Sequence, residues 1–448
     1  MRTSQELVAK TFEKFKQAAH LRAVIEENPE AMAIAAACDE AAEPFGPLHG
    51  LPVLIKDNIN TGDKMRTTAG SVALADNAPA ADAPAAANLR AAGAVIVGKA
   101  NMTEFANYMC DFRLDEKMPN GYSSRGGQTV HPLGAEFDPS GSSTGSAVAV
   151  AAGLVSMAVG SETYGSIISP SQLCGIVGIK PTDGLISKEG VIPISFTLDT
   201  LGPMTDSVAG AALLLGALSG HTYPMARTPK DITVGVCRAG FTGEKWPPDD
   251  DWRGANENML KTMAAAGMTV KELPPDDADG LAVGRDDSFM FPLMRYEFRH
   301  AINSYLAAYG TGALKNLDEI IAYNKAHADT ALKYGQGNLI AAAAIAADWQ
   351  NQAEYVEALA KRAAAKEVLA AYFDKNGVDM VVILSANCAI AAATGFPSMT
   401  LPIGKTAKGL PIGCLLLARP FDEDVLLSAG KVIEVRGQKS DKMPVKTG

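Results

Sequence analysis

An α/β fold, with a β-sheet covered by helices on both faces, is the fold class that the sequence predicts. Short apolar runs rich in β-branched residues recur along the chain, and longer stretches with helical spacing lie between them, such as Ser207–Leu218 and Asp422–Val435. Strand and helix patterns that alternate in this way indicate a sheet with helices packed against both sides. The expected buried strands are Val53–Ile55, Ala94–Val97, Gly175–Ile179, Ile232–Cys237, Asp379–Leu384, Ser398–Pro402 and Ile412–Leu417.

Three segments depart from this alternation. Residues 1–17 mix charged and apolar residues at helical spacing and lack the apolar core of a signal peptide, so we expect a surface helix there. Ser146–Gly160 is the most apolar stretch, but it is shorter than the roughly 20 apolar residues of a bilayer span, which predicts a buried helix and no membrane partner. Phe289–Phe373 is Ala-rich and has no convincing strand, so we expect a helical insertion or lid. Loops are expected at Pro44–Pro52, Pro119–Pro139 and Tyr223–Pro229.

Composition excludes several classes of protein. The chain has 448 residues, which is long enough for one large domain or two ordinary ones. Its formal net charge of −10 argues against a nucleic-acid partner, because binding to phosphate backbones needs clustered lysine and arginine. The six cysteines are spread singly, which predicts free thiols and a reducing, cytoplasmic location. No cluster of histidine, cysteine and carboxylate residues has the spacing of a metal site, so no metal or other cofactor is expected.

Two segments rich in serine and glycine carry the chemistry that the sequence suggests. Asp138–Ser146 reads DPSGSSTGS and runs directly into an apolar helix, so its hydroxyls either cap that helix or take part in a reaction. Gly160–Ser166 reads GSETYGS, and consecutive backbone N–H groups in such a loop can point at one oxygen, as stabilisation of a tetrahedral oxyanion requires. Serine alone is a poor nucleophile and therefore needs a base nearby.

A lysine is the available candidate for that base. No histidine lies in either segment, whereas Lys56 stands at the end of the apolar strand within His49–Asn58. Burial at a strand end would lower the pKa of its ammonium group and leave a useful neutral fraction. A lysine in this position is more often a solvated surface residue, so the case for Lys56 depends on its combination with the two serine segments.

These residues resemble the amidase signature family, whose hallmark is a nucleophilic serine, a second serine in a cis peptide bond and a lysine. The resemblance covers most of the chain apart from the helical stretch. The matching segments are Gly46–Asn58, Val97–Phe105, the two serine segments, Gly178–Thr182, Gly190–Ile194, Asp199–Met204 and Gly395–Gly404.

The resemblance implies roles for individual residues. Lys56 would be the neutral base, Ser142 would relay the proton across a cis Gly141–Ser142 bond, and Ser166 would be the acylated nucleophile. Ser143 would support the hydrogen-bond network around them. The oxyanion hole would be formed by the backbone N–H groups of Thr163, Tyr164, Gly165 and Ser166. The fold implied is a single large α/β domain on one mixed, twisted sheet, with residues 289–373 as a helical lid.

One branch of the family is favoured. The segment Asn120–Gln128 and the form of the nucleophile loop look most like the peptide-amidase branch, whose members remove a terminal carboxamide as ammonia. The sequence departs from the family pattern at three positions. Thr144 stands where Gly or Ser is usual, Tyr164 stands where Gly or Asp is usual, and Ile168 stands where several branches carry Arg. The phenol of Tyr164 would narrow the acyl pocket beside the nucleophile. We expect the pocket to be shaped by the helical stretch and by residues 107–128.

Other interpretations of the same motifs are weaker. Gly141–Gly145 matches the G-x-S-x-G elbow of α/β-hydrolases with Ser143 as nucleophile, but that motif needs a strand directly before it. Gly93–Lys99 copies part of a phosphate-binding loop, but Ala100 stands where Ser or Thr would hold Mg²⁺.

The sequence therefore predicts an amidase that converts a carboxamide of a small molecule or peptide to a carboxylate and ammonia, with a rate that rises toward alkaline pH. Three alternatives stay open. The chain could be the amidase subunit of a transamidation complex, an esterase or aryl acylamidase with a redirected pocket, or a weakened member that only binds amides. The sequence also leaves a homodimer open.

Overall fold

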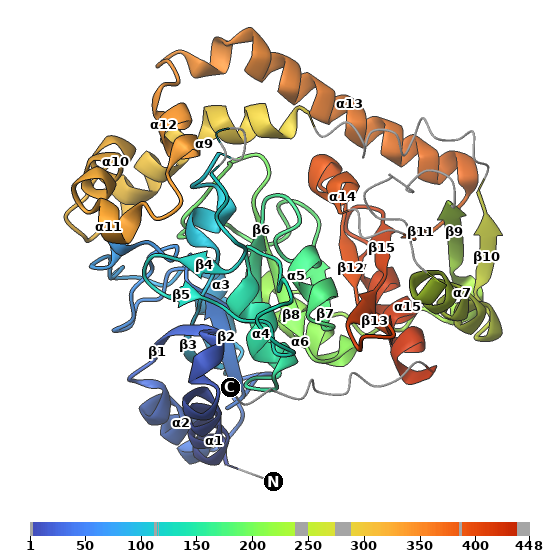
Figure 1. Ribbon diagram of the computed structural model, residues 1–448. Helices are drawn as coiled ribbons and strands as arrows, with labels where there is room; N and C mark the ends of the chain where they lie inside the picture. The colour runs from blue at the N-terminus through green and yellow to red at the C-terminus, as the bar shows by residue number, and fades with distance from the viewer. Residues whose placement is uncertain are drawn as a thin grey trace.

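The computed structural model describes residues 3–111, 114, 116–237, 250–273, 288–384 and 388–436 of the chain. Its centre is an 11-stranded mixed β-sheet in the order β1-β3-β2-β6-β8-β7-β12-β15-β11-β9-β10 (Figure 1). From one edge to the other, the strands are β1 (Val24–Glu27), β3 (Val95–Ala100), β2 (Pro52–Lys56), β6 (Met157–Glu162), β8 (Thr200–Thr205), β7 (Val177–Lys180), β12 (Ser398–Thr400), β15 (Leu415–Ala418), β11 (Met380–Ile383), β9 (Thr233–Cys237) and β10 (Thr269–Glu272).

Strand β2 lies deep in this sheet. It pairs in parallel with β3 on one side and with β6 on the other, whereas β6 pairs antiparallel with β8. Side chains alternate along β2, as a pleated strand requires: Val53 and Ile55 enter the hydrophobic core on one face, and Leu54 enters the core on the other. Because both faces are covered, the strand reads as a continuous apolar run that ends at Lys56.

Helices cover both faces of the sheet, as the sequence predicts. On one face, α3 packs against α6, and α15 packs against α6 and α7. On the other face, α1 packs against α2, and α4 lies across β2, β3 and β6. These helices are α1 (Ser4–Gln17), α2 (Ala31–Glu40), α3 (Pro84–Ala91), α4 (Thr144–Ala151), α6 (Val208–Ser219), α7 (Asp250–Ala265) and α15 (Glu423–Arg436). The short helix α5 (Ile168–Leu173) contacts β7 and β12.

Helix boundaries follow local sequence signals. Thr3 caps α1 through a reciprocal pair of bonds: the Glu6 N–H donates to Thr3 Oγ1 and the Thr3 N–H donates to the Glu6 carboxylate, both at 3.2 Å. Ser207 caps α6 by accepting the Gly210 N–H, and Gly220, with φ of 74°, ends it. The expected helices at residues 1–17, 207–218 and 422–435 are all present within a few residues.

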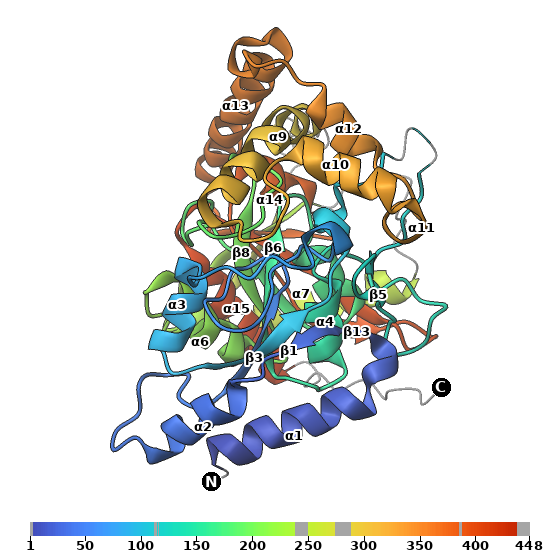
Figure 2. The ribbon, with the colours of Figure 1, turned by 90° about the vertical axis from the view of Figure 1, so that its left-hand side faces the viewer.

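A second layer of helices lies over one end of the sheet. It contains α9 (Met290–Tyr309), α10 (Leu317–Ala326), α11 (Ala328–Ala331), α12 (Gly337–Ala343) and α13 (Ala353–Asn376). Figures 1 and 2 show this layer at the end of the molecule opposite α1 and α2, with α13 as its longest helix. Its apolar side chains, including Phe298 and Ile302, share one core with Phe105 and Tyr108 from the loop after β3. The described part of the stretch 289–373 is thus helical and contains no strand.

The expected helix over Ser146–Gly160 is wrong in its second half. Helix α4 ends at Ala151, Gly153 takes a left-handed φ of 68°, and β6 begins at Met157. Its valines and alanines suit a buried strand as well as a buried helix, so periodicity alone could not separate them. Two other predicted strands are split: residues 398–402 contain β12 and the start of β13 (Pro402–Lys405), and residues 412–417 contain the end of β14 (Pro411–Gly413) and most of β15.

Other features were not expected. The predicted loop Pro119–Pro139 contains a small hairpin of β4 (Tyr122–Ser123) and β5 (Gly127–Gln128). Strands β1, β6, β8 and β10 were not predicted. Five cysteines are buried free thiols, namely Cys38, Cys110, Cys174, Cys388 and Cys414, whereas the side chain of Cys237 lies outside the described part of the structure. Across the described segments, no helix combines the length and apolarity needed to cross a bilayer.

Candidate active site

The side chain of Lys56 is enclosed where β2 ends. It is fully buried, and its Nζ lies 2.7 Å from Ser142 Oγ and 2.9 Å from Ser143 Oγ. Nζ also lies 3.0 Å from the carbonyl oxygen of Ser161, near the end of the neighbouring strand β6. Because β2 and β6 run in parallel, the ends of both strands reach the same edge of the sheet. The structure thus brings Lys56 and Ser142, two of the predicted site residues, into direct contact.

Burial changes the protonation of Lys56. Loss of hydration lowers the pKa of its ammonium group from 10.5 to about 7, and the carboxylates of Asp199 and Glu162 act in the opposite direction. A lysine with such a pKa is partly neutral near neutral pH, so it can accept a proton from a hydroxyl group beside it.

The segment before α4 has an unusual backbone that positions Ser142. The peptide bond between Gly141 and Ser142 is cis, as the sequence resemblance implied. Thr144 Oγ1 donates to the Ser140 carbonyl at 2.6 Å and so holds the turn closed. A Cβ on Gly145 would lie 2.3 Å from the Asn101 carbonyl oxygen and 2.4 Å from the Ala23 carbonyl oxygen, which explains why the second residue of α4 is a glycine packed against two backbone segments.

Ser143 is a supporting residue in this geometry. Its buried hydroxyl donates to the Ser161 carbonyl at 3.0 Å and accepts the Ser161 N–H at 3.2 Å, in addition to its contact with Lys56. A hydroxyl group engaged in this way is not available as a nucleophile. Residues 129–143 form turns and bends and contain no strand, so the nucleophile-elbow interpretation of Ser143 also lacks the strand that must directly precede that motif.

Ser166 lies in the turn between β6 and α5. Its side chain is nearly buried, with 7% exposed, and its carbonyl oxygen accepts the Ser143 N–H at 3.2 Å. The two serine segments are therefore joined through their backbones. Gly165 takes a left-handed φ of 80°, and a Cβ there would lie 2.6 Å from Cys388 Sγ, so the loop can follow this path only with glycine. Thr163, Tyr164 and Gly165 share this loop with Ser166.

Two carboxylates that were not predicted as site residues hold the loop of residues 163–166, which is called the nucleophile loop after the role predicted for Ser166. Glu162 is buried, and its Oε2 accepts the N–H groups of Ile167 at 2.8 Å and Ile168 at 3.0 Å. Asp199 Oδ1 accepts the Thr163 hydroxyl at 2.6 Å. Burial raises the pKa of both carboxyl groups, against the hydrogen bonds that they accept. An acidic residue at the end of an apolar run and before a Ser/Gly loop was the signal that could have found Glu162, the last residue of β6.

Asp199 also fixes a second loop. Its Oδ2 accepts the N–H groups of Ile194 at 2.8 Å and Ser195 at 3.0 Å. The hydroxyl of Ser195 in turn donates to the buried carboxylate of Glu297 on α9, which also accepts from Tyr355 on α13 at 2.8 Å. A continuous set of polar contacts therefore joins the nucleophile loop to the helical layer.

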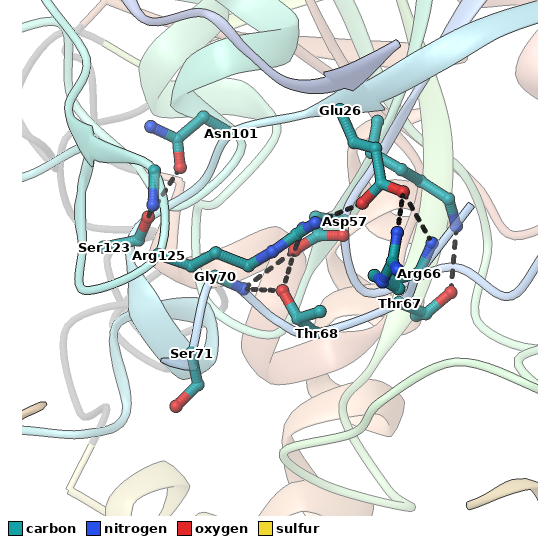
Figure 3. A network of polar contacts seen from close by, with 12 residues as sticks. Glu26, Asp57, Arg66, Thr67, Thr68, Gly70, Ser71, Asn101, Ser123 and Arg125 are labelled. Carbon is teal, nitrogen blue, oxygen red and sulfur yellow. Dashed lines mark hydrogen bonds and ion pairs between the residues drawn. The ribbon is translucent and has the colours of Figure 1, made fainter. Parts of the chain in front are cut away.

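A separate network of polar contacts surrounds Asp57, the residue that follows Lys56 (Figure 3). Asp57 Oδ2 accepts the Thr68 hydroxyl and, at 3.0 Å, the Gly70 N–H, and it lies 3.7 Å from Arg125 Nη1. Arg125 also pairs with Glu26 on β1. Burial raises the pKa of Asp57, while the positive charge of Arg125 lowers it. This network fixes the backbone at the end of β2, directly after Lys56.

A second buried lysine lies on the neighbouring strand. Lys99 Nζ donates to the Ile59 carbonyl and, at 2.9 Å, lies against Thr67 Oγ1. Burial lowers its pKa to about 8, although the carboxylate of Asp57 opposes this effect. No hydroxyl of the two serine segments is among its partners in the described structure, so its position favours a structural role in the turn after β2.

The chain is similar to known proteins over most of its length. The family model described as Amidase matches residues 6–385. A probable amidase of Arabidopsis thaliana is 31% identical over 432 residues, which cover 92% of this chain and 83% of the relative. A glutamyl-tRNA(Gln) amidotransferase subunit of Natronomonas pharaonis is 30% identical over 433 residues, which cover 88% of this chain and 98% of the relative.

Solved structures show the same similarity at the level of the fold. The structure of a peptide amidase from Stenotrophomonas maltophilia superposes with a TM-score of 0.86 at 32% identity, covering 99% of this chain and 95% of that one. The chain therefore belongs to the amidase family, and its single α/β domain with a large mixed sheet is the fold of that family. It is an enzyme that hydrolyses amides.

Proposed function

We propose that the protein hydrolyses carboxamides through an ester intermediate on Ser166, with Lys56 as the base and Ser142 as the proton relay. The contact of Lys56 Nζ with Ser142 Oγ at 2.7 Å, inside a buried site that lowers the pKa of Lys56 to about 7, is the observation that carries this proposal. Neutral Lys56 takes the proton of Ser142 as Ser142 takes the proton of Ser166, and Ser166 Oγ attacks the amide carbonyl carbon.

The loop that carries Ser166 would stabilise the negative charge that develops on the carbonyl oxygen during this attack. The N–H groups of Thr163, Tyr164, Gly165 and Ser166 are the donors we assign to this oxyanion hole. The C–N bond then breaks as the proton returns from Lys56 through Ser142 to the leaving nitrogen. Water next attacks the ester carbonyl while Lys56 accepts its proton through Ser142. The bond between the carbonyl carbon and Ser166 Oγ then breaks as this proton returns through Ser142 to Ser166 Oγ, and the acid product leaves as the carboxylate after it loses its own proton to solvent.

The substrate class that we propose is a terminal carboxamide, released as ammonia, as on a peptide C-terminus. Support comes from the similarity to the peptide amidase of Stenotrophomonas maltophilia over almost the whole chain. The similarity to the amidotransferase subunit of Natronomonas pharaonis supports the alternative of a component of a transamidation complex. Co-purification of partner chains with the tagged protein would favour that alternative. The five described cysteines, all buried free thiols, support a reducing location such as the cytoplasm.

Ammonia release from a panel of peptide amides, aliphatic amides and aryl amides tests the mechanism. Ser166→Ala and Ser142→Ala should both abolish turnover. Ser146→Ala is the matched control and should keep its activity, because Ser146 is a buried serine of the same segment whose hydroxyl donates to the Val159 carbonyl at 3.1 Å and is not among the hydrogen-bond partners of Lys56 in the described structure. Full activity in Ser166→Ala would rule out this nucleophile.

A further inference from the structure

An aromatic pair lies beside the nucleophile loop. Tyr164 precedes Ser166 by two residues, and its ring centroid is 6.3 Å from that of Phe291, with an angle of 57° between the ring planes. Phe291 is in the first turn of α9, so the contact joins the nucleophile loop to the helical layer. Tilted ring pairs at this separation are energetically favourable contacts.

The environment of Phe291 differs from that of its neighbours. Its side chain is 56% exposed, whereas Met290, Leu293 and Met294 around it are buried in the core of the helical layer. Tyr164 is half-buried and packs against the same core. The ring pair is therefore fixed by the core on the side of Tyr164 and exposed at Phe291, and Tyr164 is two residues from Ser166 along the chain. Ligand pockets are lined mainly by hydrophobic and aromatic side chains, so this aromatic pair on the loop of Ser166 is a candidate contact for the substrate.

The chemistry of the reaction decides which part of a substrate can meet this surface. When the leaving group is ammonia, every group that an enzyme can recognise lies on the acyl side of the scissile bond. The proposed oxyanion hole includes the Tyr164 N–H, so the carbonyl group would sit directly beside the backbone that carries this ring. An acyl substituent is then the part of the substrate within reach of Tyr164 and Phe291.

We propose that Tyr164 and Phe291 form an aromatic wall of the acyl pocket and select amides whose acyl part carries an aromatic or bulky apolar group. This inference rests on the proposed function and specifies its substrate class. The wall acts through desolvation of the substituent and through ring–ring contact, so it should affect substrates with a ring and leave small substrates unaffected.

Paired substrates that differ only in this substituent test the inference. The amides of N-acetylphenylalanine and N-acetylalanine carry the same scissile carboxamide, and the ratio of their kcat/KM values measures selection by the wall. Phe291→Ala should lower this ratio by about tenfold, with little change for the alanine amide. Tyr164→Ala should lower it similarly, and Tyr164→Phe, which keeps the ring, should restore it.

Phe45→Ala is the matched control. Phe45 is also 56% exposed and also pairs with an aromatic ring, that of His49 at 5.3 Å, but it lies in the loop before β2. In Phe45→Ala, the ratio of the kcat/KM values for the two amides should stay within about twofold of that of the starting protein, as for an ordinary surface substitution. A ratio near one in the starting protein, or an unchanged ratio in both Phe291→Ala and Tyr164→Ala, would overturn the aromatic wall.

Serine-directed phosphonates give a second measurement that does not depend on amide turnover. Labelling of Ser166 should be faster with a benzyl phosphonate than with a methyl phosphonate, and Phe291→Ala should remove the difference. Equal rates of labelling by the two reagents would contradict the aromatic wall but not the proposed function. Absence of amide turnover together with absence of Ser166 labelling would refute the proposed function itself, and the inference with it.

Discussion

Lys56 Nζ lies 2.7 Å from Ser142 Oγ, and both side chains are completely buried. A charged ammonium group in such a place would be costly, because burial removes its hydration. The same burial that disfavours the charge makes Lys56 a base at moderate pH. The position of the lysine at the end of an interior strand, rather than on the surface, is therefore part of the chemistry that we assign to it.

The first prediction concerns pH and activity. Because the pKa of Lys56 is lowered to about 7, kcat/KM should rise as pH increases through about 7 and then level off. The pH dependence of ammonia release, measured with a neutral amide, checks this. A rate that stays flat well below neutrality would contradict the assignment of Lys56 as the base.

The same shift predicts how stability depends on pH. Unfolded Lys56 would keep its proton up to about its ordinary pKa of 10.5, whereas folded Lys56 loses it above about 7. Between these values the unfolded state binds more protons, so this group makes the folded state more stable as pH rises. Denaturant unfolding of the starting protein and of Lys56→Met across this range isolates the effect, since only the former should gain stability from this source. Parallel curves for the two proteins would disprove the shift.

The third prediction concerns the network behind Lys56. Thr68→Val keeps the shape of the buried side chain but removes the hydroxyl that donates to Asp57 Oδ2. A carboxylate left without this donor should destabilise the protein by about 1–3 kcal/mol, and kcat should fall because Asp57 fixes the backbone next to Lys56. Thr68→Ser keeps the donor and should remain closer to the starting protein in urea unfolding and in turnover. Greater loss in the serine variant than in the valine variant would mean that packing, and not the hydrogen bond, is what matters.

Much of the site could be predicted from the sequence because its chemistry is local. Lys56 ends an apolar run, and Ser142 and Ser166 lie in two short segments whose high content of serine and glycine is distinctive. The buried strands that are rich in β-branched residues, such as β2 and β9, were also predicted from the sequence. The contacts among these segments could not be derived from spacing, because Lys56 and Ser142 meet only after α4, which follows Ser142, packs across β2, β3 and β6.

The failures have physical reasons as well. Residues 146–160 are apolar apart from Ser146 and Ser156, and a turn over residues 152–156, with left-handed backbone at Gly153, separates α4 from β6. The roles of Glu162 and Asp199 depend on tertiary contacts with the N–H groups of Ile167 and Ile168 and with the Thr163 hydroxyl. An acidic side chain in a sequence does not reveal which donors will surround it once it is buried.

The fourth prediction follows from Glu162. Glu162→Ala leaves the N–H groups of Ile167 and Ile168 without their acceptor in a buried turn. Each unpaired group costs about 1–3 kcal/mol, so the nucleophile loop should rearrange, and kcat should fall more than KM changes. Glu162→Gln keeps one carbonyl oxygen as an acceptor and should retain more activity. Steady-state kinetics on one amide with both variants checks the order, and an alanine variant with the activity of the starting protein would contradict it.

The fifth prediction concerns the space around Gly165. Gly165→Ala places a Cβ 2.6 Å from Cys388 Sγ at a backbone φ of 80°. A left-handed conformation costs a residue with a Cβ about 1–2 kcal/mol, and the contact with sulfur adds to this. The loop should therefore shift, and kcat should fall by about tenfold or more, because the proposed oxyanion donors move with it.

The two causes can be separated with a second substitution. Cys388→Ala removes the sulfur but leaves the backbone conformation unchanged, so Gly165→Ala combined with Cys388→Ala should recover part of the lost activity, while Cys388→Ala alone should stay near the starting protein. Kinetics of the four proteins in a double-mutant cycle gives the coupling between the two positions. Zero coupling would show that backbone strain alone accounts for the loss, and full activity in Gly165→Ala would mean that the loop tolerates a side chain in a position where its geometry demands glycine.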